Sequence, residues 1–252
     1  MTKPVLAVQI KDGNRIYRHP ISGEEVPSVS TIIGAGVAKP ALVGWAARMS
    51  AQYAVDHWDE LEKVNDAEKL QQIRSAHEVF KDNAATVGDV VHELIEHWQQ
   101  GRALPNDRDK KTEPYVDQFI NFMFAVQPKF LESEVTLWSR RWGYAGTADW
   151  IAEIDGKTVY GDNKTGRRVY PEVGLQVSAL ANCDFIIRPD GTEVEMPHPD
   201  KCAALHIRPR SWKLIYIRYP VECFKCFLAA KQVLDWSLHV SQEVLSDPIT
   251  GR

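Results

Sequence analysis

Residues 146–166, GTADWIAEIDGKTVYGDNKTG, contain two largely apolar runs on either side of an Asp155-Gly156 pair. An Asp-Gly pair between such runs is a strong hairpin signal, because both residues of a tight two-residue turn need a positive φ. We therefore predict two antiparallel strands, at about 147–154 and 157–164. This hairpin decides the fold, since the segments around it have the patterns of further strands and helices of one α/β core.

Two carboxylates of the hairpin are symmetric about its turn. Asp149 and Asp162 are equally far from the turn, so they can lie side by side on neighbouring strands. Lys164 follows Asp162 by two residues and shares its face of the strand. Adjacent carboxylates repel one another, and a divalent cation removes that cost. With the carbonyl of Asn163 they form the oxygen-rich ligand set that Mg²⁺ or Mn²⁺ prefers.

The Asp-x-Lys pattern by itself is more typical of a surface hairpin with a weak cross-strand ion pair. The longer context favours a site, because residues 146–149 precede one strand, residues 161–166 end the other, and Gln176 opens a helix. Trp150 follows Asp149 and points to the opposite face of the strand, so we expect it in the core.

Motifs stand in order along a larger part of the chain: G-x-x-x-H-x-x-x-E at Gly88, His92 and Glu96, GTADW at 146–150, DNKTG at 162–166, and then Gln176. In this combination the chain resembles the RecB-like exonuclease branch of the PD-(D/E)xK nuclease superfamily, which includes lambda-type and CRISPR-adaptation nucleases. The resemblance spans about residues 84–220, and residues 1–80 lie outside it.

The resemblance implies a restriction-endonuclease-like fold, in which a mixed central sheet is flanked by helices, and a metal site. Asp149 and Asp162 would hold Mg²⁺ or Mn²⁺ together with the carbonyl of Asn163, and His92 would be the further ligand characteristic of the RecB-like branch. A helical histidine four residues before a glutamate is by itself more typical of a surface pair. The assignment of His92 therefore depends on the hairpin motifs.

The resemblance also implies roles for three other side chains. Lys164 would orient or deprotonate the attacking water and offset charge on the scissile phosphate. Glu134, on the strand before the hairpin, takes the place of an auxiliary acidic residue, and Gln176 would position the water or the DNA backbone. The implied reaction is metal-assisted hydrolysis of a phosphodiester.

Two departures from the family pattern affect which of the family's features the resemblance implies for this chain. Leu180 stands four residues after Gln176, where family members often have a tyrosine. Several relatives bind a 4Fe–4S cluster through one early and three late cysteines, but this chain has no cysteine before Cys183. Cys223 and Cys226 are three residues apart in an apolar helical run, where small buried thiols are common. We therefore expect no iron–sulfur cluster.

Basic residues cluster near the predicted site, and we expect four of them to contact DNA: Arg140, Arg141, Arg167 and Arg168. The alternative is a solvated charged face, which is what charge runs usually form. Because the formal net charge is −4, the chain as a whole is not basic, and DNA binding would depend on such a local track. Tyr144, in a glycine-flanked segment, is the best candidate for stacking on an exposed base.

The rest of the chain predicts helices before residue 131 and a mixed pattern after it. The N-terminus has the pattern of a short β element, and residues 27–36 that of a linker. Helices are expected at about 41–58, 66–80, 84–100, 115–126, 171–187 and 221–240, with further strands at 132–146, 202–209 and 212–219. The predicted domains are an N-terminal β element with a helical elaboration (1–83), a nuclease core (84–245) and a C-terminal tail (246–252).

Composition leaves the function open. With 252 residues, of which 44% are hydrophobic and 25% charged, the chain is long enough for one large domain. No uncharged apolar stretch reaches the length of about 18 residues that a membrane span needs, and the charged N-terminus does not resemble a signal peptide. Four cysteines without an export signal indicate free thiols and a cytoplasmic protein.

The function expected from these features is a metal-dependent DNA exonuclease without a helicase domain, acting in recombination, repair or replication of a phage or mobile element. The alternatives are a structure-specific endonuclease of the same superfamily and a catalytically inactive nuclease fold that binds DNA. The expected partner is DNA. The resemblance to lambda-type nucleases implies a second kind of partner, which is either further copies of the chain or a single-strand annealing protein.

Overall fold

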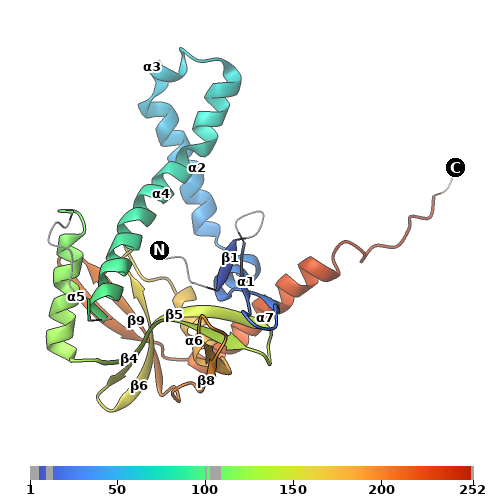
Figure 1. Cartoon of the computed structure of the whole chain (residues 1–252). Helices are drawn as coiled ribbons and strands as arrows, with labels where there is room; N and C mark the ends of the chain where they lie inside the picture. Colours follow the sequence, from blue (N-terminus) through green and yellow to red (C-terminus); the bar gives the residue numbers. More distant parts are fainter. Residues whose placement is uncertain (1–5, 10–13, 100, 103–108, 251–252) are drawn as a thin grey trace.

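The computed structural model of the chain describes residues 6–9, 14–99, 101–102 and 109–250. The centre of the molecule is a seven-stranded mixed sheet with helices on both faces (Figure 1). A three-stranded sheet and a helical arm belong to the N-terminal part. The predicted α/β class, the mixed sheet flanked by helices and the helical N-terminal portion are therefore confirmed. No helix among these residues is long and apolar enough to span a membrane.

The large sheet consists of β4 (Lys129–Ser139), β5 (Tyr144–Ile154), β6 (Lys157–Lys164), β7 (Phe185–Ile187), β8 (Glu193–Val194), β9 (Lys201–Arg208) and β10 (Ser211–Tyr216). Its strand order is β10-β9-β6-β5-β4-β7-β8. Neighbouring strands are antiparallel except β6 and β9, which are parallel. The hairpin of β5 and β6 therefore lies near the middle of the sheet.

The predicted hairpin has the predicted register. The ladder of β5 and β6 runs from the turn to the pair formed by Trp150 and Gly161. Asp155 and Gly156 have φ angles of 51° and 69°, the two positive values that a tight turn of this kind requires. The turn residues thus fix which side chains of the two strands face one another.

Helices cover the two faces of the large sheet and close two apolar cores. One face is covered by α1 (Val29–Gly36), α6 (Glu172–Ala181) and α7 (Pro220–His239). The other is covered by α5 (Glu113–Val126) and the C-terminal part of α4 (Asp66–Gln99). The last turns of α4 therefore pack on the large sheet, where Val91 and Ile95 belong to the second core.

The N-terminal part of α4 forms an arm with α2 (Pro40–Asp56) and α3 (Trp58–Leu61), which extends away from the sheet (Figure 1). Two helices were expected at 66–80 and 84–100, but α4 is one helix of 34 residues. Residues 81–87 contain neither proline nor glycine, so nothing in the sequence interrupts the main-chain hydrogen bonds. The domain boundary expected at residue 84 falls inside this helix.

The N-terminal β element is a sheet of β1 (Ala7–Gln9), β2 (Arg15–Arg18) and β3 (Glu25–Pro27). Residues 10–13, between β1 and β2, lie outside the described residues, and with them most of the turn that the Asp12-Gly13-Asn14 sequence predicts. The predicted linker at 27–36 is wrong, because most of it forms α1. Ser28 caps this helix by accepting a 3.0 Å hydrogen bond from the main-chain nitrogen of Thr31.

The helix expected at 171–187 is shorter than predicted. Helix α6 ends at Ala181, and Phe185–Ile187 form β7, which pairs with β4. A short apolar run such as Phe-Ile-Ile suits a buried strand as well as a buried helix, so its periodicity does not distinguish the two.

Candidate metal centre

The candidate site lies where β5 and β6 separate. Their ladder ends at the pair of Trp150 and Gly161, and Asp149 and Asp162 are the next residues on the two strands. The main-chain nitrogen of Asn163 donates a 2.6 Å hydrogen bond to Oδ2 of Asp149 across the opening. The structure therefore brings together the two strand positions that the hairpin symmetry predicts.

Helix α4 brings His92 to this opening. Its Nε2 atom lies 3.0 Å from the main-chain oxygen of Asn163, and its Nδ1 atom lies 3.5 Å from Oδ2 of Asp149. The side chains of His92 and Asp149 are 20% and 13% exposed, so both can be reached from solvent. Gly88 lies one turn earlier, and a Cβ added there would lie 3.1 Å from the hydroxyl of Thr165. The small residue lets the helix approach the end of β6 closely.

Glu134 joins the group from β4. One potential ligand atom from each of His92, Glu134 and Asp149 lies within 4.8 Å of the others. The φ angle of Glu134 is 49°, a left-handed conformation that costs a non-glycine residue about 1–3 kcal/mol. Glu134 lies between the paired residues Ser133 and Val135, opposite Asp149, and a register shift precedes it in the ladder. Irregularities of this kind re-aim side chains beside functional sites.

Acidic groups lie close together at the opening, and the pKa values of Glu134 and Asp149 are raised. Burial, together with the charges of Asp149, Glu96 and Asp162, raises the pKa of Glu134 to about 8. Burial and the charge of Asp162 also raise the pKa of Asp149 to about 6. A cation between these carboxylates would offset their repulsion and favour their charged forms.

Asp162 forms a second group with Lys164 and Gln176. Its Oδ2 atom lies 2.5 Å from Nζ of Lys164, and its Oδ1 atom accepts a 2.5 Å hydrogen bond from Nε2 of Gln176. Lys164 also donates to Oε1 of Gln176, at 3.2 Å. Burial disfavours the charged ammonium, but Asp162 and Asp149 outweigh that effect and raise the pKa of Lys164 above its ordinary value. Lys164 is therefore a fixed cation.

The grouping differs from the predicted one in two residues. Glu134, predicted as an auxiliary acid, lies among the potential ligands. Asp162, predicted as a ligand, contacts Lys164 and Gln176, and its role as a ligand stays a prediction. No pattern in the sequence reveals this division, because it depends on the left-handed backbone of Glu134.

The group of potential ligands can be compared with what a divalent cation requires. Adjacent ligands about 2.1 Å from an octahedral cation lie about 3 Å apart. Nε2 of His92 and the main-chain oxygen of Asn163 are 3.0 Å apart. The carboxylates of Glu134 and Asp149 can add two oxygen donors, since one ligand atom of each lies within 4.8 Å of a ring nitrogen of His92. The donor set is therefore one nitrogen and three oxygens, which leaves positions for water or substrate.

Trp150 fixes the main chain behind the site. It is buried, as predicted, and its Nε1 atom donates a 3.0 Å hydrogen bond to Oδ1 of Asn163. A Cβ added to Gly161 would lie 1.9 Å from the indole ring, so only glycine allows the ring to cross the hairpin there. The indole thereby holds the residue whose carbonyl faces His92, a role that the sequence alone does not indicate.

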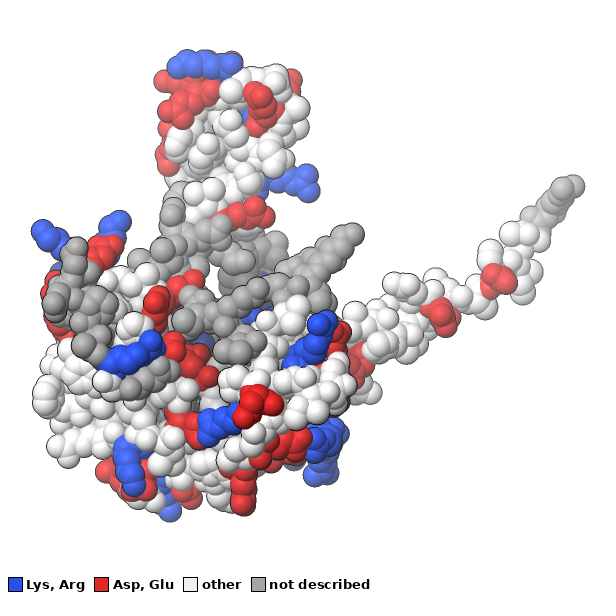
Figure 2. All heavy atoms as spheres, viewed as in Figure 1, with Lys and Arg blue, Asp and Glu red and all other residues white. Residues whose placement is uncertain are grey.

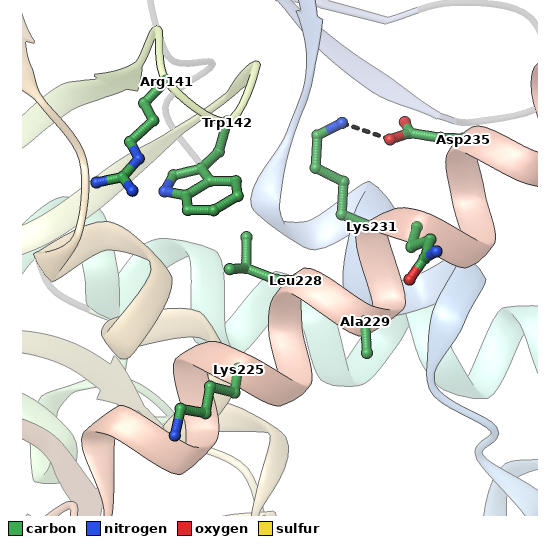
Figure 3. Close-up of a pocket in the computed structure, with 8 residues that line it drawn as sticks. Arg141, Trp142, Lys225, Leu228, Ala229, Lys231 and Asp235 are labelled. Atoms are coloured by element: carbon green, nitrogen blue, oxygen red, sulfur yellow. Dashed lines mark hydrogen bonds and ion pairs between the residues drawn. The ribbon is translucent and has the colours of Figure 1, made fainter.

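Arg140 and Arg141, two of the expected DNA contacts, lie at the turn between β4 and β5. The guanidinium of Arg140 pairs with Glu193 at 2.6 Å and lies over the ring of Phe185. Arg141 lines an open pocket of about 500 Å³ beside α7, where Trp142 and Lys225 also lie (Figure 3). None of the residues that line this pocket belongs to the ligand group.

Arg167 and Arg168 lie in the exposed loop that follows β6. The guanidinium of Arg168 is 4.7 Å from the centre of the Tyr170 ring. The start of the loop is held by Arg208, which donates a 2.5 Å hydrogen bond to the main-chain oxygen of Thr165. These two arginines directly follow the strand of the candidate site, which keeps them as candidate DNA contacts.

The expectation that Tyr144 is exposed and stacks on DNA is wrong. The side chain is fully buried, its hydroxyl donates a 2.8 Å hydrogen bond to the main-chain oxygen of Ala179, and its ring packs edge-on against Phe227. The flanking glycines suggested a loop, but the turn ends at Gly143, whose φ is 61°, and Tyr144 begins β5. Tyr144 therefore belongs to the core.

Charged side chains of both signs are interspersed on the face of the molecule that Figure 2 shows, on the body and on the arm. The formal net charge of −4 agrees with this mixture. A surface that binds DNA would therefore be a local one.

Known proteins give no sequence match to the chain and a weak structural likeness. No family model matches the chain, and no curated protein matches it. Among solved structures, the chain is similar to one described as "Crystal structure of SSO0001", with a TM-score of 0.33 and 14% sequence identity, over 76% of this chain and 71% of that chain. A likeness at this TM-score indicates neither a family nor an activity for the chain.

Proposed function

We propose that the chain is a metal-dependent nuclease that hydrolyses DNA phosphodiesters, with a restriction-endonuclease-like core of the RecB-like branch. The observation that carries the proposal is the convergence of His92, Glu134 and Asp149 within 4.8 Å, beside the ion pair of Asp162 and Lys164. A candidate cation site thus adjoins a fixed ammonium. Both can serve the hydrolysis of a phosphodiester, because negative charge on the phosphate must be offset in the transition state.

Four groups would hold the cation: the imidazole of His92, the carboxylates of Glu134 and Asp149, and the carbonyl of Asn163. A divalent cation bound there supplies Lewis-acid chemistry, which activates water and offsets charge on a phosphate. Mg²⁺ and Mn²⁺ both suit a set in which oxygen donors predominate.

Lys164 acts in this proposal as a cation toward the phosphate, since Asp162 and Asp149 favour its charged form. Asp162 and Gln176 hold the ammonium at 2.5 Å and 3.2 Å. A charge that is already oriented stabilises the transition state without a cost of reorganisation. The proposed contacts to the DNA backbone are Arg167 and Arg168, in the loop that follows Lys164.

Within this class we propose an exonuclease that acts in the cytoplasm, in recombination, repair or replication of a phage or mobile element. This narrower choice depends on the sequence motifs around His92, Asp149 and Asp162, not on the geometry. A structure-specific endonuclease with the same site is the alternative. A catalytically inactive DNA-binding fold is less well supported, because such a fold has no need to keep the ligand group and Lys164 together.

Digestion of end-labelled linear, closed circular and single-stranded DNA with Mg²⁺, and with a chelator as control, tests the proposal. We expect release of short products from linear DNA while closed circles stay intact. Nicked or linearised circles would assign the endonuclease instead. DNA binding without cleavage of any form, with Mg²⁺ or Mn²⁺, would contradict the proposed function. An Asp149→Asn variant purified in parallel identifies any contaminating nuclease.

A further inference from the structure

A partly buried polar contact joins the N-terminal sheet to the strand that carries Asp149. The hydroxyl of Tyr17, on β2, lies 2.8 Å from Oγ1 of Thr147, on β5, although 130 residues separate them in the chain. Tyr17 is only 1% exposed. Strand β2 lies outside residues 84–220, so the contact involves a part of the chain that the sequence motifs do not cover.

The contact is two residues from Asp149. Ala145, Thr147 and Asp149 are alternate residues of β5. Ser28 forms a β-bridge to Ala145, and Tyr17 binds Thr147. The N-terminal segment thus holds β5 at both of the alternate positions that precede the ligand.

The strand that carries Tyr17 is itself held on several sides. It pairs with β1 and with β3. Oγ1 of Thr31 accepts a 3.0 Å hydrogen bond from the main-chain nitrogen of Arg15 and donates a 2.9 Å hydrogen bond to its main-chain oxygen. The first turn of α1 therefore fixes the main chain two residues before Tyr17.

Glu134 also acts on the same hydroxyl. Burial is the main effect on the hydroxyl of Tyr17, and it raises the pKa. The hydrogen bond with Thr147 and the charge of Arg15 lower the pKa, whereas the charge of Glu134 raises it. The hydroxyl is therefore a neutral hydrogen-bonding group. Thr136, the partner of Thr147 across the ladder, is two residues from Glu134. The residue that Tyr17 contacts is thus two residues from Asp149, and its cross-strand partner is two residues from Glu134.

We infer that Tyr17 is a positioning residue of the candidate metal centre: through Thr147 it fixes the segment of β5 that directs Asp149 toward the cation. The inference rests on the proposed function, because it concerns the same cation. A contact that only stabilised the fold would leave metal affinity unchanged. A positioning role makes metal affinity depend on a single buried hydroxyl.

Tyr17→Phe and Thr147→Val each remove the contact with little change in volume, and Thr147→Ser keeps the hydroxyl. Tyr160→Phe is the matched control, because Tyr160 is as deeply buried and its hydroxyl donates a 2.7 Å hydrogen bond to the main-chain oxygen of Pro197. Mn²⁺ binding to the full chain is measured by calorimetry without DNA. The kcat and KM for linear DNA are then measured at saturating Mn²⁺, and thermal melting verifies that each variant is folded.

We expect Tyr17→Phe and Thr147→Val to bind Mn²⁺ about tenfold more weakly, the usual scale for residues that orient a ligand. The double variant should lose no more than either single one. The kcat should fall while KM stays nearly constant, and Thr147→Ser should retain wild-type affinity. If Tyr17→Phe does not fold, the comparison of Thr147→Val with Thr147→Ser decides the question.

Two outcomes would overturn the inference in different ways. Wild-type Mn²⁺ binding together with unchanged affinity in Tyr17→Phe and Thr147→Val, as in Tyr160→Phe, would overturn the positioning role and leave the proposed function intact. Failure of the wild-type chain to bind Mn²⁺ would overturn both.

Discussion

The Nε2 atom of His92 and the main-chain oxygen of Asn163 lie 3.0 Å apart, although 71 residues separate them in the chain. The contact joins the end of the long helix α4 to the end of strand β6. Glu134 and Asp149 come from two further strands, so four elements each contribute one group to the site. Such a site forms only in the folded chain, and a cation that binds it must stabilise the fold.

Replacement of His92 by alanine should weaken metal binding. The imidazole is the only nitrogen donor proposed for the group, and its loss should raise the Mn²⁺ concentration needed for half-maximal DNA digestion by at least about tenfold. His77→Ala is the control, since His77 is a partly exposed histidine of the same helix that is not among the potential ligands. A metal titration that does not change in His92→Ala would assign His92 a structural role.

Asp162→Asn should abolish Mg²⁺-dependent digestion while the melting temperature changes little. The amide has the same shape as the carboxylate, but it removes the charge that holds Lys164 at 2.5 Å. Digestion of linear DNA and thermal melting of the same preparation check both parts. Full residual activity would remove Asp162 from the mechanism.

Lys164→Ala should reduce turnover more than DNA affinity. A fixed donor to the transition state contributes about 10²–10³-fold to kcat, whereas contacts with the DNA backbone are shared among many groups. Single-turnover cleavage rates and DNA binding, measured at one salt concentration, separate the two effects. Equal losses in both would indicate a binding role for Lys164.

Binding of Mn²⁺ should release a proton from Glu134. Its carboxyl pKa is raised from 4.5 to about 8, so the folded chain binds this proton more tightly than the unfolded chain does. The stability of the metal-free protein should therefore fall as the pH rises from 4.5 toward 8, while the affinity for Mn²⁺ rises over the same range.

Calorimetry in buffers of different ionisation enthalpy measures this proton release, and thermal melting at several pH values measures the stability. Glu134→Gln should flatten both dependences. If the variant keeps the wild-type pH dependence, another group carries the proton.

Tyr144→Phe should lower the free energy of unfolding by about 1 kcal/mol, because one buried hydrogen bond to the main-chain oxygen of Ala179 is lost while the main-chain nitrogen of Asn182 still donates to that oxygen. DNA affinity should stay the same, since the ring of Tyr144 is buried in the core and cannot contact DNA. Denaturant unfolding and DNA binding measure the two quantities. A selective loss of DNA affinity would restore the stacking role that the structure does not support.

The hairpin and its facing carboxylates could be predicted because they depend on short-range rules. An Asp-Gly turn sets the register, and strand alternation then sets the side on which each residue lies. The buried position of Trp150 follows from the same alternation. The helices could also be predicted, and the break expected within α4 is wrong because the two periodic patterns meet there without a stop signal.

The remaining parts of the site depend on long-range geometry. Glu134 reaches the ligand group through a left-handed residue and a register shift, which no local pattern requires. Tyr144 was misjudged because glycine neighbours suggest a loop, whereas β5 already begins at this residue. The contact of Tyr17 with Thr147 spans 130 residues and had no signal in the sequence.

The most direct measurement is the anomalous scattering of crystals grown with Mn²⁺. The account predicts a peak bounded by the imidazole of His92, the carboxylates of Glu134 and Asp149 and the carbonyl of Asn163, with ligand distances of about 2.0–2.4 Å. The peak should disappear in Asp149→Asn. An Mn²⁺ peak elsewhere, or none at this position in protein that digests DNA with Mn²⁺, would contradict the account.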